Sequence, residues 1–336
     1  MTPGFAARAK RKAEMRKVSV VIPNFNGAKF IPECFEALRK QSFKDFDVIF
    51  VDNASEDESI ELARSCSKGL SLRVIALDIN YGFAKAVNEG IKASGAEYVI
   101  LLNNDTKAGA HFAEELVLAI DGHKDIFSAQ AHMLQYHNSR LTDSAGDYFC
   151  LLGWAFSRGK DKPARLYKED CDIFSSCAGA AIYRRAVFEK IGYFDEKFFA
   201  YLEDVDMGYR ARLYGYRNIF AHKAKVLHVG SGASGSRHNS FKVSLAARNA
   251  VFVMYKNFAP WQKAVNFIPV LAGILIKALF FASKGLGKDY VKGVFSAAGG
   301  LSGIKKTDFG GICADNSREV QKELFGNVMK LLRVFG

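Results

Sequence analysis

The segment that decides the fold runs from Val18 to Ser55 and reads VSVVIPNFNGAKFIPECFEALRKQSFKDFDVIFVDNAS. Its first part, 18–23, is a short β-branched apolar run closed by a proline, which predicts a buried strand. Residues 30–41 carry apolar side chains at helical spacing, and 47–51 is a second apolar run. A strand, a helix and a strand in this order predict a parallel β–α–β unit.

The same alternation continues beyond Ser55. Residues 56–66 are predicted to form a helix opened by a capping box of Ser55 and Glu58. The predicted elements that follow are a strand over 72–77, a helix over 82–94 and a strand over 98–102. This order predicts an α/β domain with a mostly parallel, Rossmann-like sheet flanked by helices. In such sheets ligands bind just beyond the carboxyl ends of the strands.

The second part of the chain has a looser pattern. The predicted elements are a strand over 129–134, a glycine-containing loop over 143–162, helices over 184–191 and 204–214, and a strand over 224–229. The last strand places His228 at its end.

The composition limits the classes of partner. Apolar residues make up 49% of the 336, enough for a sizeable core. The net charge of +12 suits nucleic acid, anionic lipid or a phosphorylated substrate. Because no known nucleic-acid-binding motif is present, we expect no nucleic-acid partner. The six cysteines lack CxxC spacing, which argues against zinc, and the basic start over 1–17 has no apolar leader after it. We therefore expect a cytoplasmic protein.

Residues 264–283 form an apolar segment followed by Lys284, Lys288 and Lys292. A membrane-spanning helix needs about 20 apolar residues, so the length is borderline. Pro269, Lys277 and the lysines that follow favour an amphipathic helix lying on an anionic membrane surface. A core helix packed on the domain and a true span are the alternatives.

Polar residues suited to a nucleotide follow three of the predicted strands. They are Pro23, Asn24 and Asn26 after the first strand, Asp52 after the second, and Asn80, Gly82 and Lys85 at the start of a helix. A carboxylate accepts hydrogen bonds from a base, and free N–H groups at a helix start favour a phosphate. Each residue type is also common in ordinary turns, so the inference depends on their shared position at one sheet edge.

The segment Asn103-Asn104-Asp105 follows the predicted strand over 98–102. Asp105 is a candidate ligand for a hard divalent cation, which needs few protein oxygens when a diphosphate completes its shell. His228, at another strand end, is a candidate second ligand. A hydrogen-bonded structural histidine is the alternative interpretation of His228.

Residues 199–210 read FAYLEDVDMGYR and place three carboxylates in four positions. Each like charge beside Asp204 makes its ionisation harder, so the cluster needs a compensating role. Proton abstraction, metal binding and pairing with Arg210 or Arg212 would each supply one. The alternative is an exposed helix N-terminus, where Glu203, Asp204 and Asp206 suit the helix dipole.

Taken in order, these motifs resemble those of the inverting family 2 glycosyltransferases, and most closely their rhamnosyltransferase branch. The resemblance depends on VVIPNFN (20–26), VDNAS (51–55), NYGFA (80–84), LLNND (101–105), EDVD (203–206) and His228. It covers residues 18–258, including Arg248-Asn249 and Lys256-Asn257. It implies a GT-A fold, a nucleotide-sugar donor and a divalent metal, Mg²⁺ or Mn²⁺.

The resemblance also implies a role for each candidate residue. Asp52 would contact the base, and the loops with Pro23, Asn24, Asn26, Asn80, Gly82, Lys85, Asn103 and Asn104 would bind the nucleotide sugar. Asp105 would be the main metal ligand, with His228 completing the site. Asp204 would be the catalytic base, supported by Glu203 and Asp206. Asn103 stands where many relatives have the first aspartate of a DxD motif, and its amide binds a cation less strongly.

The resemblance divides the chain into three regions. A basic arm over 1–17 precedes a GT-A catalytic domain over 18–258, whose nucleotide-binding half is 18–120 and whose acceptor and catalytic half is 121–258. A helical, membrane-associating region over 259–336 follows.

The implied reaction transfers a sugar with inversion to a hydroxyl of a lipid-linked saccharide, in the synthesis of cell-surface polysaccharide. The first choice of donor is dTDP-rhamnose, followed by UDP-galactofuranose and other UDP-hexoses. The enzyme would lie on the inner face of the cell membrane, and whether it forms a homo-oligomer is left open. A nucleotidyltransferase and a non-catalytic scaffold are the rival classes. The absence of a Gly-rich basic loop after the first strand argues against the former, and the intact carboxylates argue against the latter.

Overall fold

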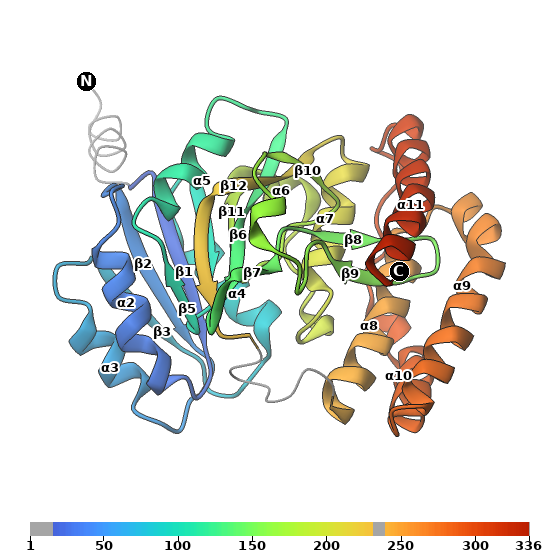
Figure 1. Ribbon diagram of the computed structural model, residues 1–336, viewed down its shortest axis with the longest axis horizontal. Helices are drawn as coiled ribbons and strands as arrows, with labels where there is room; N and C mark the ends of the chain where they lie inside the picture. Colours follow the sequence, from blue (N-terminus) through green and yellow to red (C-terminus); the bar gives the residue numbers. More distant parts are fainter. Residues whose placement is uncertain (1–15, 231–238, 336) are drawn as a thin grey trace, which may run out of the picture.

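The computed structural model describes residues 16–230 and 239–335, so most of the predicted basic arm lies outside the described residues. The main sheet has the strand order β10-β12-β6-β11-β4-β1-β2-β3, with β5 and β7 added beside β12 and β6. Helices cover both faces of this sheet, and three C-terminal helices lie at the end of the molecule remote from β3 (Figure 1).

The N-terminal half follows the predicted alternation. The strands are β1 (Val18–Asn24), β2 (Phe46–Asp52), β3 (Leu72–Ala76) and β4 (Tyr98–Leu102), and the helices are α2 (Ile31–Arg39), α3 (Ser59–Cys66) and α4 (Phe83–Ala93). The four strands pair in parallel. The apolar side chains of β1, β2 and β4 are almost all buried because helices cover both faces, whereas those of the edge strand β3 are only partly buried.

The predicted capping box at Ser55 and Glu58 is wrong. Helix α3 begins at Ser59 and has no side-chain cap. The Ser55 hydroxyl instead donates to Asp52 Oδ1 at 2.7 Å, and its backbone N–H donates to Asp52 Oδ2 at 2.9 Å. The serine therefore belongs to the polar edge of the sheet.

In the second half the sheet becomes mixed. Its elements are β5 (Thr106–Ala108), α5 (Phe112–Ile120), β6 (Ile126–Gln135), β7 (Asn138–Ser144), β10 (Cys171–Ile173), β11 (Ala180–Arg184), α6 (Arg185–Ile191) and β12 (Arg217–His228). Strand β11 runs antiparallel between β4 and β6, whereas β12 pairs in parallel with β6. Residues predicted as a loop over 143–162 contain a hairpin of β8 (Asp147–Phe149) and β9 (Ala155–Ser157).

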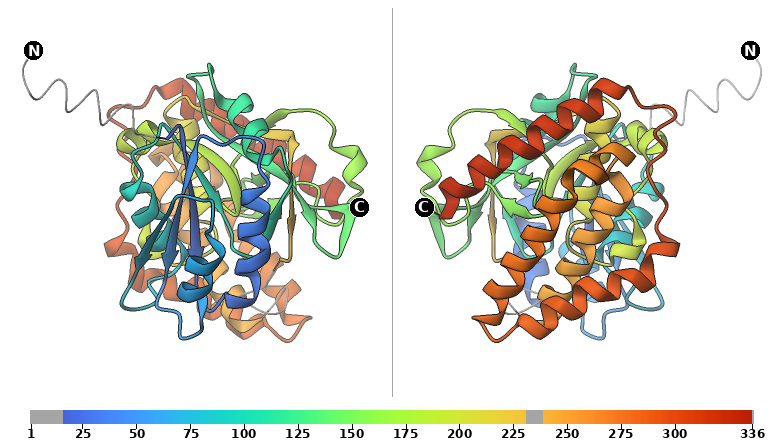
Figure 2. Two further views of the ribbon diagram at one scale, coloured as in Figure 1. Left: turned by 90° about the vertical axis from the view of Figure 1, so that its left-hand side faces the viewer. Right: turned by 90° about the vertical axis from the view of Figure 1, so that its right-hand side faces the viewer.

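Helices α7 (Glu203–Leu213) and α8 (Ser240–Asn257) join the sheet to the C-terminal region. That region consists of α9 (Pro260–Ala282), α10 (Gly287–Gly300) and α11 (Ala314–Phe335). A separate apolar core connects the β8–β9 hairpin, α7, α8 and α11. Its members include Phe149, Tyr209, Phe252 and Leu324. Figure 2 (right) shows the C-terminal helices side by side over this end of the domain.

Candidate active site

The polar edge of the parallel strands is a closed hydrogen-bond network around Asp52. Asn24 donates from Nδ2 to Asp52 Oδ1 at 2.8 Å, and Ser55 contacts both carboxylate oxygens. Asn26 takes part through its backbone N–H, which donates to Ser55 Oγ at 2.9 Å. We call the side chains of Asn24, Asp52, Asn53 and Asn80 the donor edge. The structure brings the predicted residues Asn24, Asn26, Asp52 and Asn80 together at this edge.

Asn53 was not among the predicted site residues, yet it holds two loops together. Its Nδ2 donates to Asn80 Oδ1 at 2.8 Å and to the carbonyl of Gly82 at 3.0 Å, and its Oδ1 accepts from the Tyr81 N–H. Gly82 has φ +85°, and a Cβ there would overlap Phe199. Glycine is required at this position because the loop of residues 80–82 packs closely against the loop that precedes α7.

Asn104 joins the next strand end to the same network, since its Nδ2 donates to Asn24 Oδ1. A Cβ on Gly27 would overlap both of these amides. Asn103 lies against the turn before β11, where its N–H donates to the carbonyl of Gly179 at 2.8 Å.

Lys85 is directed elsewhere in the structure. Its ammonium pairs with Glu89 at 2.9 Å and with Glu196 at 3.5 Å, at one side of α4. These two carboxylates raise its pKa, so the amine stays charged, but it makes no contact with the Asp52 network among the described contacts.

Asp105 and His228 are neighbours because of strand register. β5 pairs antiparallel with β12 so that Thr106 lies opposite His228, and His228 Nε2 lies 3.3 Å from Asp105 Oδ1. The other ring nitrogen, Nδ1, contacts Asp143 Oδ2 at 2.8 Å, and Lys160 pairs with Asp143. The two carboxylates raise the pKa of His228 to about 9 against the opposing effect of burial.

This pair fits a divalent cation. Two ligands bound to one Mg²⁺ or Mn²⁺ at right angles lie about 3 Å apart, as these two atoms do. Asp143 was missed from the sequence because residues 143–162 show no clear periodicity and were predicted as a loop, whereas Asp143 lies near the end of β7. It orients the imidazole through the second nitrogen, as carboxylates beside metal-bound histidines usually do.

A second set of possible ligands, Asp147, Cys177 and Asp204, places its ligand atoms within 4.8 Å of one another. Burial raises the pKa of the Cys177 thiol well above its usual value, and the charges of Asp147 and Asp204 raise it further. A protonated thiol is a poor ligand, and hard cations prefer oxygen. The set therefore fits Mg²⁺ or Mn²⁺ less well than Asp105 and His228.

The loop before α7, residues 199–202, has an unusual backbone, and we call it the base loop. Phe199, Tyr201 and Leu202 have φ between +64° and +69°, which is costly for residues with a Cβ. One buried side chain holds this conformation. Asn249 of α8 donates from Nδ2 to the carbonyls of Phe198, Ala200 and Tyr201 at 2.9, 2.9 and 2.7 Å.

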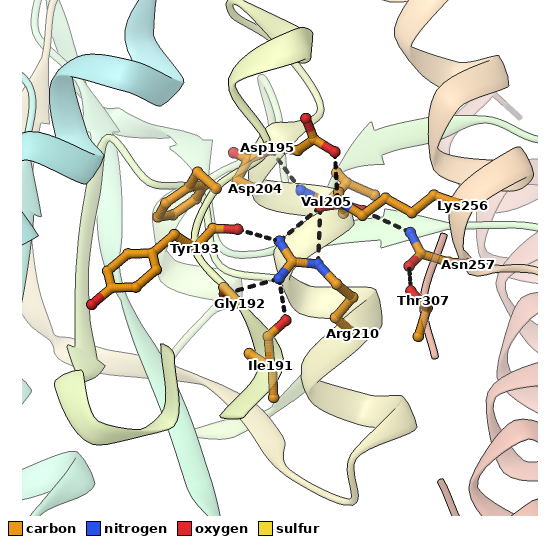
Figure 3. A network of polar contacts seen from close by, with 12 residues as sticks. Ile191, Gly192, Tyr193, Asp195, Asp204, Val205, Arg210, Lys256, Asn257 and Thr307 are labelled. Carbon is orange, nitrogen blue, oxygen red and sulfur yellow. Dashed lines mark hydrogen bonds and ion pairs between the residues drawn. The ribbon is translucent and has the colours of Figure 1, made fainter. Parts of the chain in front are cut away.

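Asp206 is the centre of a buried ionic cluster and not a substrate contact. It is fully buried and pairs with Arg210 at 2.8 Å and Lys256 at 3.0 Å, while Asn257 donates to its other oxygen. Arg210 also donates to the carbonyls of Ile191, Gly192 and Tyr193 at the end of α6 (Figure 3). The predicted pairing of Asp206 with Arg210 is confirmed.

Arg210 and Lys256 hold the pKa of Asp206 below its ordinary value despite its burial. The predicted pairing of Glu203 with an arginine is wrong. Glu203 is buried, and its Oε2 has no hydrogen-bond partner in the described part of the chain.

Asp204 differs from both neighbours. It is half-buried, and its oxygens accept the N–H groups of Val205 at 2.8 Å and Ala178 at 3.4 Å. Burial raises its pKa, and its charge helps to raise the pKa of Glu203 and Asp147 well above their ordinary values, with burial as the larger cause. Asp204 therefore ionises first among the three, as a proton acceptor should.

The separate parts of the site lie along one edge. Ala178, which donates to Asp204, is followed by Gly179, whose carbonyl accepts from Asn103. On the other side, β7 ends near Asp143 beside His228, and the chain then reaches Asp147 beside Asp204. The fold thus places the donor edge, the Asp105–His228 pair and Asp204 at the carboxyl ends of the strands.

This sheet, with its polar carboxyl edge and an ionisable carboxylate at a helix start, defines an α/β domain of the GT-A type. The family model described as Glycosyl transferase family 2 matches residues 19–192, more than half of the chain. The chain belongs to glycosyltransferase family 2.

Two curated relatives match smaller parts of the chain. The poly(ribitol-phosphate) beta-N-acetylglucosaminyltransferase TarS of Staphylococcus aureus is 30% identical over 112 residues, covering 32% of this chain and 20% of TarS. Glycosyltransferase GlyG of Streptococcus pneumoniae is 27% identical over 164 residues, covering 47% of this chain and 53% of GlyG. The chain therefore spans about a fifth of TarS and about half of GlyG.

Solved structures share the fold at low sequence identity. GalNAc-T7, solved with UDP, GalNAc and Mn²⁺, has a TM-score of 0.60 at 16% identity, covering 74% of this chain and 49% of that one. The mannosyltransferase PcManGT of Pyrobaculum calidifontis, solved with GDP-Man and Mn²⁺, has a TM-score of 0.52 at 17% identity, covering 88% and 82%. TarS 1–349 with UDP-GlcNAc has 0.51 at 20%, covering 85% and 75%.

Proposed function

We propose that this protein transfers a sugar, with inversion, from a nucleoside diphosphate to a hydroxyl of a lipid-linked saccharide. The observation that carries the proposal is the position of Asp204. It is a half-buried carboxylate with no cationic partner among the described residues, on the same edge as the Asp52 network and the Asp105–His228 pair. Among the described contacts it accepts only the backbone N–H groups of Val205 and Ala178, which leave its charge without a partner.

Asp204 acts as the general base in this proposal. It removes the proton from the acceptor hydroxyl, and the oxygen attacks the anomeric carbon on the face opposite the nucleotide. Glu203 and Asp147 hold their protons while Asp204 is ionised, because of their burial and its charge. The base loop and the Asn249 hydrogen bonds hold the carboxylate in place.

Asp105 and His228 would hold a divalent cation, Mg²⁺ or Mn²⁺. Such a cation supplies positive charge against the departing diphosphate. The Mn²⁺ in the structures of GalNAc-T7 and PcManGT supports this assignment. Asp143 keeps the imidazole oriented toward Asp105.

Two observations bear on the identity of the donor sugar nucleotide. The order of the motifs resembles the rhamnosyltransferase branch and favours dTDP-rhamnose. TarS, whose structure contains UDP-GlcNAc, favours a UDP-hexose, and UDP-galactofuranose is a further candidate. The donor edge contacts the pyrimidine nucleotide in each case, through Asp52, Asn80 and the N–H groups that open α4.

Helix α9 supports attachment to the inner face of the cell membrane. In the described part of the chain it is the one helix long and apolar enough to cross a bilayer. Only 11% of its apolar 18-residue stretch is buried. Its exposed side includes Ile268, Leu275 and Leu279 at 75%, 57% and 73% exposure. Its buried residues are Gln262, Asn266 and Gly273, so the polar side faces the domain and the apolar side faces outward.

This arrangement favours a helix lying on the membrane over a core helix or a span. Gln262 and Asn266 bond to Gln321 of α11, and Gly273 accepts from Trp154, so the domain contacts α9 along its length. Between Pro260 and Thr307 the sequence holds seven lysines and one acidic residue, Asp289, which suits anionic lipid. The alternative of a core helix is therefore disfavoured.

Nucleotide release across a panel of dTDP-, UDP- and GDP-sugars, with an acceptor and either metal, tests the transferase assignment. We expect one pyrimidine donor to exceed the others, and loss of turnover on chelation. Absence of binding to every nucleotide sugar in the panel would contradict it.

Co-sedimentation with vesicles of equal parts phosphatidylglycerol and phosphatidylcholine tests the membrane assignment. We expect Ile268→Asp, Leu275→Asp and Leu279→Asp together to abolish binding, while Leu118→Asp on α5, an equally exposed leucine, leaves it intact. Unchanged sedimentation of the triple variant would show that the apolar side of α9 does not bind lipid.

A further inference from the structure

A pocket of about 340 Å³ lies between the β8–β9 hairpin, α8, α9 and α10. Its walls are mostly apolar and include Leu202, Ala250, Met254, Ile274 and Val294. The volume falls within the usual range for small-molecule sites, about 300–1,000 Å³. The pocket lies outside the donor edge, and none of the residues assigned above to the nucleotide or the metal lines it.

Two lysines interrupt the apolar lining, Lys242 from α8 and Lys277 from α9. The ammonium of Lys277 lies over the Trp154 ring, 5.2 Å from its centroid, and no carboxylate of the described residues is within ion-pair distance of it. A half-buried cation without a counter-charge costs stability. Burial accordingly lowers the pKa of Lys277 to about 8. Such a site suits a ligand that brings one negative charge and an apolar chain.

The pocket adjoins both the membrane-facing helix and the proposed base. Ile274 and Lys277 come from α9, whose other side carries the exposed apolar residues. Tyr201 and Leu202 of the base loop also line it, and Asp204 follows two residues later. The β8–β9 hairpin also connects the pocket to the proposed base. Asp147, at its start, lies beside Asp204, and Trp154, near its tip, forms part of the pocket wall.

Trp154 and Gly273 fix the hairpin tip against α9. The indole N–H donates to the carbonyl of Gly273 at 3.1 Å, and a Cβ on Gly273 would overlap the carbonyl of Leu152. The wall of the pocket is therefore built by a close contact that requires glycine, and not by a loose gap between helices.

We propose that this pocket binds the acceptor lipid, with its aliphatic chain on the apolar walls and its phosphate at Lys277. This inference rests on the proposed function, because it names the part of the acceptor that the enzyme holds. A chain entering from the membrane side of α9 would leave the attached saccharide beside the base loop, within reach of Asp204. The commitment is to a lipid phosphate, not to free phosphate.

The two tryptophans of the chain make the test direct. Trp261→Phe leaves Trp154, in the pocket wall, as the only tryptophan, whose fluorescence is excited selectively at wavelengths that tyrosine does not absorb. The probe is dodecyl phosphate brominated at the second carbon, because Lys277 would hold the phosphate beside Trp154 and bromine quenches tryptophan on contact. It is used below its critical micelle concentration. The comparison probes are the matching brominated dodecanol and inorganic phosphate.

We expect saturable quenching by the alkyl phosphate and at least about tenfold weaker binding in Lys277→Met, since a hydrogen bond or ion pair to a charged group is lost. Lys284→Met removes a lysine in the turn just after the same helix and should change nothing. Ala250→Phe, or Val294→Phe if the first variant misfolds, fills the pocket and should abolish quenching, with thermal melting as the check on folding.

Three results would overturn the proposal. They are no saturable quenching, equal binding of the alcohol and the phosphate with no effect of Lys277→Met, and displacement by inorganic phosphate at the same concentration, which would indicate a free-anion site. Nucleotide titrations of the same protein separate this from the proposed function. Quenching without donor binding removes the transferase and keeps the lipid site, whereas donor binding without quenching does the reverse.

Discussion

The donor edge and the base loop both present carboxylates at the same side of the sheet, but they are stabilised in different ways. At the donor edge, Asp52 is held by Asn24 and Ser55, which stand in the loops after the two adjoining strands. The base loop is strained, and it is held by Asn249 of α8, which lies at least 47 residues further along the chain. The first site follows from strand order, whereas the second is imposed by helices outside the sheet.

The largest expected effect separates Asp204 from Glu203, its immediate neighbour. Asp204→Asn should lower transfer about 10²- to 10⁴-fold, because the general base is lost while the shape of the side chain is kept. Glu203→Gln, the same chemical change one residue earlier, should keep near-normal transfer, because that carboxyl is already protonated. Nucleotide release measures both. Equal losses in the two variants would contradict the base assignment.

The next effect concerns the ionic cluster below the base. Asp206→Asn should lower the free energy of unfolding by about 3–5 kcal/mol, because Arg210 would be left buried without its counter-charge and Lys256 would keep only its pair with Asp195. Asp315→Asn breaks an exposed pair with Arg318 and should cost under about 1 kcal/mol. Urea denaturation measures both, and similar values would mean that the cluster does not stabilise α7.

Asn249→Ala tests whether α8 holds the base loop. The carbonyls of Ala200 and Tyr201 lose the Asn249 amide, whereas that of Phe198 keeps the Arg248 guanidinium as a donor. We therefore expect about 2–3 kcal/mol lower stability and a marked loss of transfer. Asn316→Ala removes one bond to the carbonyl of Leu213 at the opposite end of α7. That control should lower stability by about 1 kcal/mol without loss of transfer. Full activity in Asn249→Ala would show that the base loop keeps its shape unaided.

The two regions also differ in how far their structure followed from sequence. Strand ends could be placed from local apolar runs, and parallel order then brought Asn24, Asp52 and Asn80 together. Asn53 was missed because an asparagine in a turn gives no sign of which loop it will hold. Asp143 and Asp147 lie in a segment without periodicity, so their approach to His228 and Asp204 depends on long-range packing. The motif Arg248-Asn249 could be recognised in the sequence, but the hydrogen bonds from Asn249 to the base loop could not.

The inward side of α9 shows the same limit. Its apolar length and the lysines after it were evident, and they predicted a membrane-associated helix. Which side faces the protein depends on Gln321 and Trp154, far away in sequence, because they bond to Asn266 and Gly273. Periodicity alone would have placed the apolar side inward.

The smallest expected effect is a pH dependence that distinguishes Glu203 from Asp206. Burial and the charge of Asp204 raise the folded-state pKa of Glu203, so above about pH 4.3, its ordinary value, the unfolded chain releases this proton first. The folded state then binds more protons, and stability falls as pH rises toward the folded pKa. Asp206 acts oppositely, because its lowered pKa adds stability that is lost as pH falls below about 4.

Glu203→Gln should therefore raise stability at neutral pH by about 1 kcal/mol, because it removes an unpaired buried carboxyl and keeps an amide of the same shape. It should also flatten the decline between pH 5 and pH 7 without changing the loss below about pH 4. Chemical denaturation of the variant and the parent at these pH values measures both parts. If the stability of Glu203→Gln declined with the same slope, the raised pKa would belong to another group. Asp147 would then be the next residue to substitute, because Asp204 raises its pKa as well.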